Sequence, residues 1–271
     1  MTTIVGILNC TPDSFSDGDP GASEASLYER AQKLIDEGAD IIDIGGDSTR
    51  PGSQCVSVEE EWSRIGKLIE RVAHVISVSV DTHKAEVARR AIQAGARYIN
   101  DVGGASDPEL VSVVAQSQVS YIFMYSASEV PHVFADGPAR GQILDTLNTW
   151  IKGRISVLTS AGIPSERLIA DTGMGAFVSR DPDVSLEILK RYGDLQAPDG
   201  GLMFGCSRKG FLKRGDEESP SERDPLSSLY GALAVSKRSL GTPIYLRVHN
   251  VALQKTCIDT WRRLMKCPPV V

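Results

Sequence analysis

The chain has few cysteines, no long apolar run and no basic stripe. Its five cysteines are scattered and odd in number, and they show neither the spacing of a disulfide framework nor that of a zinc site. No apolar stretch is long enough to span a bilayer, and the N-terminus lacks the basic start and continuous apolar segment of a signal peptide. We therefore expect a cytoplasmic protein that is not bound to a membrane.

The charges are also mixed rather than of one sign. Lysine and arginine total 29 against 35 aspartates and glutamates, which gives a formal net charge of -6. This balance argues against a nucleic-acid partner, although local basic residues could still hold a small anion. Hydrophobic residues make up 41% of the 271 residues, which is enough for one large core. We expect residues 1–271 to form a single domain.

Short apolar runs rich in isoleucine and valine recur along the whole chain. Most of them do not alternate with polar residues, which indicates parallel strands that are covered on both faces. The expected strands are 4–8, 41–44, 76–80, 98–100, 120–124, 168–170, 202–205 and 244–248.

Longer segments with helical periodicity lie between these runs. Ser57 and Glu60 have the spacing of a capping box, and Pro108 suits a first helical turn. The expected helices are 23–37, 57–72, 84–94, 107–116, 142–161, 183–192, 226–240 and 251–265. About eight strand–helix pairs predict an α/β fold, the (β/α)8 TIM barrel. The alternative, an open doubly wound sheet, would need a glycine-rich phosphate loop that the chain lacks.

Polar side chains follow the expected strands at the point where each strand ends. In a barrel these ends meet on one rim, and barrel enzymes build their sites there. The polar and flanking residues at the strand ends are Asn9; Asp47, Ser48, Thr49 and Arg50; Asp81 and His83; Asn100 and Asp101; Met124 and Tyr125; Asp171; Ser207, Arg208 and Lys209; and Arg247, His249 and Asn250.

These residues offer two kinds of chemistry. Acidic and amide side chains suit the edge of a nitrogen-rich heterocycle, and basic side chains suit an anion such as phosphate. Asn9 adds an oxygen for a Mg²⁺ ion held mostly by phosphate and water. Together they suggest a group transfer with pyrophosphate as the leaving group. The first kind comprises Asp81, Asn100 and Asp171, and the second comprises Arg50, Lys209, Arg247 and His249.

Each of these residues also has a purely structural interpretation. An aspartate at a strand end often only caps the following helix or loop. Cys10 and Cys206 lie beside the strand-end loops and are nucleophile candidates, but a free cysteine is more often a small buried residue. The convergence of many polar residues on one rim favours a functional site more strongly than any single residue does.

Six segments of the chain resemble dihydropteroate synthases of folate biosynthesis, in the same order and with the same spacing. They are NCTPDSFSDG at 9–18, GGDSTRPG at 45–52, SVDT at 79–82, INDV at 99–102, SRK at 207–209 and RVHNV at 247–251. The resemblance covers nearly the whole chain and implies a (β/α)8 barrel.

The resemblance implies a transferase that joins 6-hydroxymethyl-7,8-dihydropterin diphosphate to p-aminobenzoate, with Mg²⁺ as cofactor. The products are 7,8-dihydropteroate and pyrophosphate. The C–O bond of the pterin substrate is expected to break first, in an SN1-like step, so that no protein nucleophile is needed. The resemblance also implies a homodimer packed through the late helices, and a target for sulfonamides.

Residue roles follow from the resemblance. The matching positions imply pterin binding by Asp81, Asn100, Met124, Asp171 and Lys209; diphosphate binding by Asn9, Thr49, Arg247 and His249, with Asn9 also at the metal; and a p-aminobenzoate pocket formed around Phe15, Arg50, Pro51 and Gly210. The expected catalytic residues are Asp171, Lys209, Arg247 and His249. Negative charge on Asp171 would stabilise the pterin cation, and Arg247, His249 and Mg²⁺ would stabilise the leaving pyrophosphate.

The chain departs from the family pattern at several positions. Asp47 stands where glutamate is usual, Tyr125 replaces a usual histidine, and Gly210 stands where a polar residue is common. The segment 171–177 lacks the usual proline and terminal lysine. The stretch 173–186 is somewhat similar to sulfonamide-insensitive variants, so that drug insensitivity stays an open hypothesis.

Two other functions remain as alternatives. A methyltetrahydrofolate:corrinoid methyltransferase resembles the synthase in its barrel and pterin pocket, but the segments 9–18 and 45–52 favour the synthase. A non-catalytic pterin-binding paralogue would account for Tyr125 and the altered loop after Asp171. A degenerate copy is expected to lose some of the polar rim residues, and this chain retains them.

Overall fold

The computed structural model describes residues 1–11, 24–48, 55–128, 133, 137–215, 218–238 and 241–266. In this part of the chain, parallel strands close into a barrel in chain order, and β8 pairs with β1. The strands are β1 (Thr2–Asn9), β2 (Ile41–Gly45), β3 (Ser77–Asp81), β4 (Tyr98–Asp101), β5 (Ser120–Met124), β6 (Leu168–Asp171), β7 (Leu202–Phe204) and β8 (Ile244–Val248). The expected strands and the expected barrel are confirmed.

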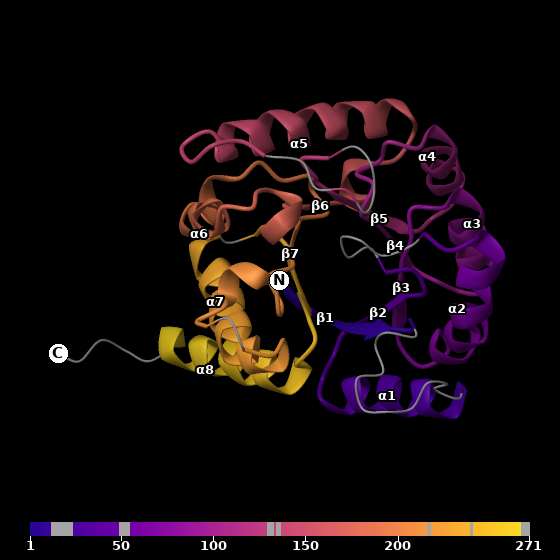
Figure 1. The fold of residues 1–271 in the computed structure, drawn as a ribbon. Coiled ribbons are helices and arrows are strands. Elements are labelled where there is room, and N and C mark those ends of the chain that lie inside the picture. Colours follow the sequence, from indigo (N-terminus) through magenta and orange to yellow (C-terminus); the bar gives the residue numbers. More distant parts are fainter. Residues whose placement is uncertain are drawn as a thin grey trace.

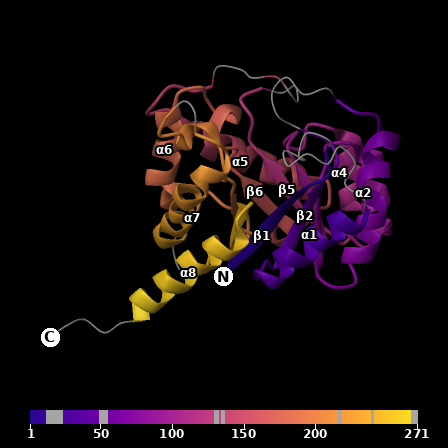
Figure 2. The ribbon, with the colours of Figure 1, turned by 60° about the horizontal axis from the view of Figure 1, so that its bottom comes forward.

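The α-helices form an outer ring around the strands (Figure 1). They are α1 (Glu24–Asp36), α2 (Val58–Val72), α3 (Ala85–Gln93), α4 (Pro108–Ala115), α5 (Ile143–Ser160), α6 (Pro182–Lys190), α7 (Asp224–Lys237) and α8 (Val251–Lys266). The last turns of α8 extend beyond the barrel wall (Figure 2). Among the described helices, none combines the length and the apolar composition needed to cross a membrane.

Local sequence signals set several helix ends. The Ser57 hydroxyl accepts a hydrogen bond of 3.1 Å from the backbone N–H of Glu60, as the capping spacing predicts. Asp107 caps α4 in the same way, directly before Pro108. Helix α6 begins at Pro182, one residue earlier than expected, because Asp181 caps it through the N–H of Asp183.

The barrel interior is built in layers. Five inward-facing side chains form a small apolar cluster, with Tyr98 and Tyr245 packed against it, and the two tyrosine rings meet edge to face at 6.3 Å. The cluster consists of Val5, Ile41, Ile122, Ile169 and Met203. Because side chains at i and i+2 face the same side of a strand, the next inward layer falls two residues further along each strand. That layer contains Asp43, Asn100, Met124, Asp171 and Arg247, and it forms the floor of the polar rim.

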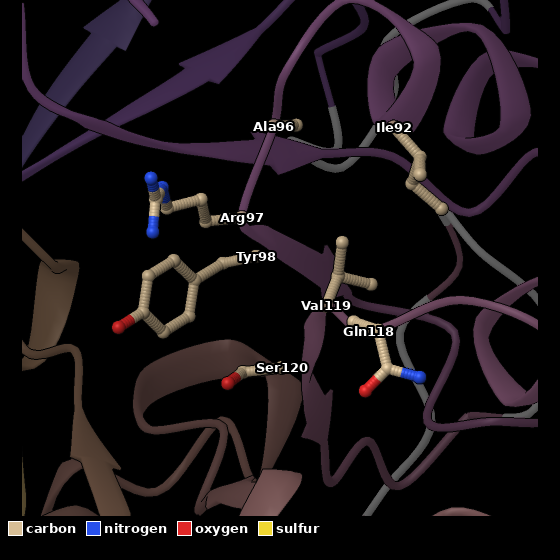
Figure 3. Close-up of a pocket in the computed structure, with 7 residues that line it drawn as sticks. All are labelled: Ile92, Ala96, Arg97, Tyr98, Gln118, Val119 and Ser120. Carbon is tan, nitrogen blue, oxygen red and sulfur yellow. The ribbon is translucent and has the colours of Figure 1, made fainter.

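A pocket of about 410 Å³ lies at the opposite, N-terminal end of the strands (Figure 3). Tyr98 and Ser120, which begin β4 and β5, contribute to its lining together with Arg97. Residues at this end of a TIM barrel serve stability rather than catalysis. A catalytic site is therefore expected at the carboxyl ends of the strands.

Candidate active site

The expected site residues within the described part of the chain converge at the carboxyl ends of the strands. Asn9, Asp81, Met124 and Asp171 each end a strand, and Asn100 lies one residue before the end of β4. Lys209 and His249 follow β7 and β8, and Arg247 lies within β8. The closure of the barrel brings these residues from different strands to one rim. Phe15, Thr49, Arg50 and Pro51 lie outside the described residues.

Arg247 is the centre of a buried ionic network. Its Nε donates to Oδ2 of Asp43 at 2.7 Å, and its Nη2 donates to Oδ2 of Asp81 at 2.6 Å. The Asn100 amide donates to the same Asp43 oxygen at 3.1 Å. Asp43 is fully buried, and the sequence analysis did not select it. The sequence could have identified Asp43 as a site residue, because it is a charged residue in an otherwise apolar strand, two positions after Ile41.

The buried carboxylates of this network have further acceptor capacity. Oδ1 of Asp43 and Oδ1 of Asp81 are buried and make no hydrogen bond within the described part of the chain. Burial raises the pKa of Asp81 to about 7; the positive charge of Arg247 opposes this shift and the nearby Asp43 charge reinforces it. A ligand that presents N–H donors would satisfy these oxygens.

Asp171 is held by the tight turn that follows β6. Its Oδ1 accepts a hydrogen bond of 2.9 Å from the backbone N–H of Gly173. Gly173 has φ of 63°, and a Cβ there would lie 1.8 Å from the carbonyl oxygen of Tyr125, so that only glycine fits. Burial raises the pKa of Asp171, while the neighbouring Lys209 charge lowers it.

The same turn also positions Lys209. Its ammonium group donates to the carbonyl oxygen of Met174 at 2.6 Å and lies 5.1 Å from the centre of the Phe177 ring. Burial lowers the pKa of Lys209 to about 8, against the opposing effect of the Asp171 carboxylate. The altered segment 171–177 therefore supports both charged groups, a role that its sequence did not reveal.

His249 is positioned by Ser207. The Ser207 hydroxyl lies 2.9 Å from Nδ1 of His249 and accepts a hydrogen bond of 3.1 Å from the His249 backbone N–H. Arg208, between Ser207 and Lys209, instead makes a bidentate ion pair with Asp224. Its Nε donates to Oδ1 at 2.7 Å and its Nη2 donates to Oδ2 at 2.8 Å. Arg208 is thus a structural residue, and its neighbours on either side are the ones associated with the site.

Two cysteines and one glycine lie beside these strand-end loops. Cys10 and Cys206 are buried, and burial raises the pKa of each thiol to about 12, which supports the structural interpretation over a nucleophile. Gly210 begins a 3-10 turn, η5 (Gly210–Leu212), and among the described residues beyond its two chain neighbours, no heavy atom lies within 4 Å of the place a Cβ would take. The backbone at Gly210 is therefore open to a ligand.

The chain was compared with known proteins. A family model described as "Pterin binding enzyme" matches residues 5–249. The dihydropteroate synthase of Bacillus subtilis is 37% identical over 254 residues, which are 92% of this chain and 84% of the relative. The chain belongs to the dihydropteroate synthase family.

Solved structures of the dihydropteroate synthase family share the whole barrel. The Xanthomonas albilineans enzyme with 4-aminobenzoic acid has a TM-score of 0.86 at 33% identity, covering 98% of this chain and 94% of that one. The Burkholderia cenocepacia enzyme complexed with 7,8-dihydropteroate has a TM-score of 0.84 at 28% identity, covering 98% and 92%. The eight-stranded barrel described above is therefore the fold of these enzymes.

Proposed function

We propose that this chain joins 6-hydroxymethyl-7,8-dihydropterin diphosphate to p-aminobenzoate and releases pyrophosphate. One observation carries the proposal: buried acceptors and partly buried cations lie together on the carboxyl rim of a barrel that belongs to the dihydropteroate synthase family. Relatives with this fold are described with 4-aminobenzoic acid and with 7,8-dihydropteroate, which are a substrate and the product of this reaction.

The buried carboxylates would recognise the pterin. Asp81 and Asp171 supply acceptors for the N–H groups along the edge of the ring, and the Asn100 amide supplies both a donor and an acceptor. Lys209 would donate to a ring carbonyl or nitrogen, and Met124 would pack against a face of the ring. An anionic Asp171 would also stabilise the positive charge that develops on the pterin as its C–O bond breaks.

The basic residues would stabilise the leaving pyrophosphate. Arg247 donates to Asp43 and Asp81 through Nε and Nη2, so that its pKa stays high despite burial. Its remaining N–H donors would bind phosphate oxygens, together with His249 held by Ser207. The aniline nitrogen of p-aminobenzoate would then attack the pterin cation and lose a proton.

Asn9 is the residue we propose at the Mg²⁺ site. It ends β1 in register with Gly45 and is partly exposed, and its side chain offers one neutral oxygen. A single protein oxygen fits Mg²⁺, which is commonly held by substrate phosphates and water with few protein ligands. When bound, the ion would neutralise charge on the diphosphate. Thr49 is proposed to bind the same diphosphate.

The p-aminobenzoate pocket is proposed to form between two parts of the rim. Gly210 would present its backbone N–H at the start of η5 to the carboxylate of the substrate. Phe15, Arg50 and Pro51 are proposed to complete the pocket, on the strength of the family motifs that contain them. A sulfonamide would compete with p-aminobenzoate for this pocket.

We also propose that the enzyme is a homodimer packed through α7 and α8. These two helices contact each other, and each carries exposed apolar side chains. Leu229 and Leu233 of α7 are 49% and 39% exposed, and Leu264 and Met265 near the end of α8 are 69% and 66% exposed. Sedimentation velocity should show a species of twice the chain mass.

The function is tested by the release of pyrophosphate from the pterin diphosphate in the presence of Mg²⁺. We expect release that depends on p-aminobenzoate and is reduced by sulfamethoxazole in competition with it. Pterin binding without any release would favour the non-catalytic paralogue. Methyl transfer from methyltetrahydrofolate to a corrinoid protein, again without release, would favour the methyltransferase.

The rate should also depend on pH through Lys209. Because burial lowers the pKa of Lys209 to about 8, its charge is present below that pH and is lost above it. We expect kcat/KM for the pterin substrate to fall above pH 8, and Lys209→Arg to move this fall upward, since arginine stays protonated. The measurement is the initial rate of pyrophosphate release by both proteins across the pH range from about 6 to about 10. A basic limb that is identical in both proteins would contradict it.

A further inference from the structure

A cluster of metal-binding side-chain types lies on the same rim, apart from the residues assigned to substrate. Ligand atoms of Asp47, Cys55 and His83 all lie within 4.8 Å of one another. The pairing of β2 with β3 explains two of the three positions. Gly45 is in register with Asp81, so that Asp47 and His83 each lie two residues beyond paired strand ends. Cys55 comes from the segment just before α2.

The Asp47 carboxylate is held in place by a buried ion pair. Lys84 donates to Oδ2 of Asp47 and to Oε2 of Glu61, both at 2.6 Å. The Glu61 side chain is fully buried, and its charge offsets that of Lys84. Lys84 thus bridges the two carboxylates and fixes the direction of the Asp47 carboxylate.

The other Asp47 oxygen points to a ligand. The Asp47 side chain is only 3% exposed, and its Oδ1 has no hydrogen-bond partner within the described part of the chain. Leaving a buried carboxylate oxygen unpaired costs free energy, which a bound cation would recover. The Cys55 sulfur lies beside the same carboxylate, 3.8 Å from Oδ2.

We propose that Asp47, Cys55 and His83 bind Zn²⁺. A carboxylate oxygen, a thiolate sulfur and an imidazole nitrogen are all zinc ligands, at about 2.0–2.3 Å from the ion. Tetrahedral geometry at those lengths places ligand atoms about 3.3–3.8 Å apart, so that side-chain rotations suffice to close the site. On binding, the Cys55 thiol releases its proton to solvent, and the thiolate sulfur forms the bond to zinc. The fourth position is open to water.

The ligand set distinguishes this site from the proposed Mg²⁺ site. Mg²⁺ selects oxygen ligands, whereas thiolate and imidazole favour zinc. Asp101 does not complete the site, since its two oxygens accept hydrogen bonds from Gly103, Ala105 and Tyr121. Zinc binding here does not depend on the proposed reaction, and each can fail without the other.

The experiment is a cobalt titration of the full-length, reduced and metal-free protein. Co²⁺ takes zinc sites and gives a thiolate charge-transfer absorption that reports directly on a sulfur ligand. We expect saturation at one equivalent and loss of the band when Zn²⁺ is added. Cys55→Ser should abolish the band, and Asp47→Asn and His83→Gln should each weaken cobalt binding by about tenfold or more. Cys257→Ser, at the partly buried cysteine of α8, is the matched control and should leave the band intact.

Loss of a metal ligand can be distinguished from loss of folding. Cys55 is exposed, so that Cys55→Ser should keep the native circular dichroism spectrum and melting temperature, and loss of its band then reports on ligation alone. A band that persists in Cys55→Ser, a band lost in Cys257→Ser, or no band in the unmodified protein would each overturn the proposal.

Discussion

Asp171→Asn is expected to lower kcat by about 10²–10³-fold, the size of effect seen when a single preorganised electrostatic group is removed. The substitution keeps the volume of the side chain, and its amide oxygen can still accept the hydrogen bond from Gly173. It removes the negative charge that is proposed to stabilise the developing pterin cation. Because Asp171 is also proposed to accept from the pterin ring, we expect the pterin dissociation constant to rise as well, but by a smaller factor than the fall in kcat.

The measurement is p-aminobenzoate-dependent pyrophosphate release at saturating substrate, with pterin binding followed separately by calorimetry. Asp194→Asn is the control, because Asp194 is an exposed aspartate that pairs only with Arg191 among the described residues. It should keep the full rate. A normal kcat in Asp171→Asn would show that the charge does not act in the rate-limiting step.

Arg247→Met is expected to lower the free energy of unfolding by about 3–5 kcal/mol, because breaking a buried ion pair leaves uncompensated charges. Arg247 bonds to two buried carboxylates, so that its removal leaves both Asp43 and Asp81 without their cation. The loss should be smaller at pH 5 than at pH 8. The pKa of Asp81 is already raised to about 7, so a protonated Asp81 is favoured below that pH and its ionisation costs stability as the pH rises through it.

Urea unfolding at the two pH values measures this effect. A double substitution, Arg247→Met with Asp43→Leu, should recover part of the lost stability, because it removes one of the two carboxylates left without a cation. Arg191→Met is the control, since Arg191 is half-exposed and pairs at the surface, and it should change stability by less than about 1 kcal/mol. Equal stability of Arg247→Met and the unmodified protein would contradict the role of Arg247 in the network.

The sequence allowed the barrel to be predicted because its signals are local. Apolar runs such as 120–124 and 244–248 coincide with β5 and β8, and capping residues such as Ser57 mark helix starts. The rim residues could be predicted for the same reason, since parallel strands place all their carboxyl ends on one side. Asn9, Asp81 and Asp171 accordingly end their strands as expected.

The contacts that hold the rim residues in place could not be predicted in this way. Ser207 contacts His249 across 42 residues of sequence, and Met174 holds Lys209 across 35. Cys55 looked like an isolated cysteine, because its neighbours Asp47 and His83 come from separate strand ends. Sequence spacing rules for zinc rest on short-range pairs of cysteines and histidines, whereas Asp47 lies eight residues before Cys55 and His83 joins them only in the folded barrel.

The positions of strands, helices and their polar ends can be read from local patterns, because periodicity, capping and turn residues act within a few positions. Which charges meet depends on the folded barrel. Arg247 and Asp43 are 204 residues apart and are joined by a 2.7 Å hydrogen bond because β8 closes the barrel against β1, which pairs with β2. Such distances depend on strand register and barrel closure, which are properties of the assembled sheet rather than of any one segment.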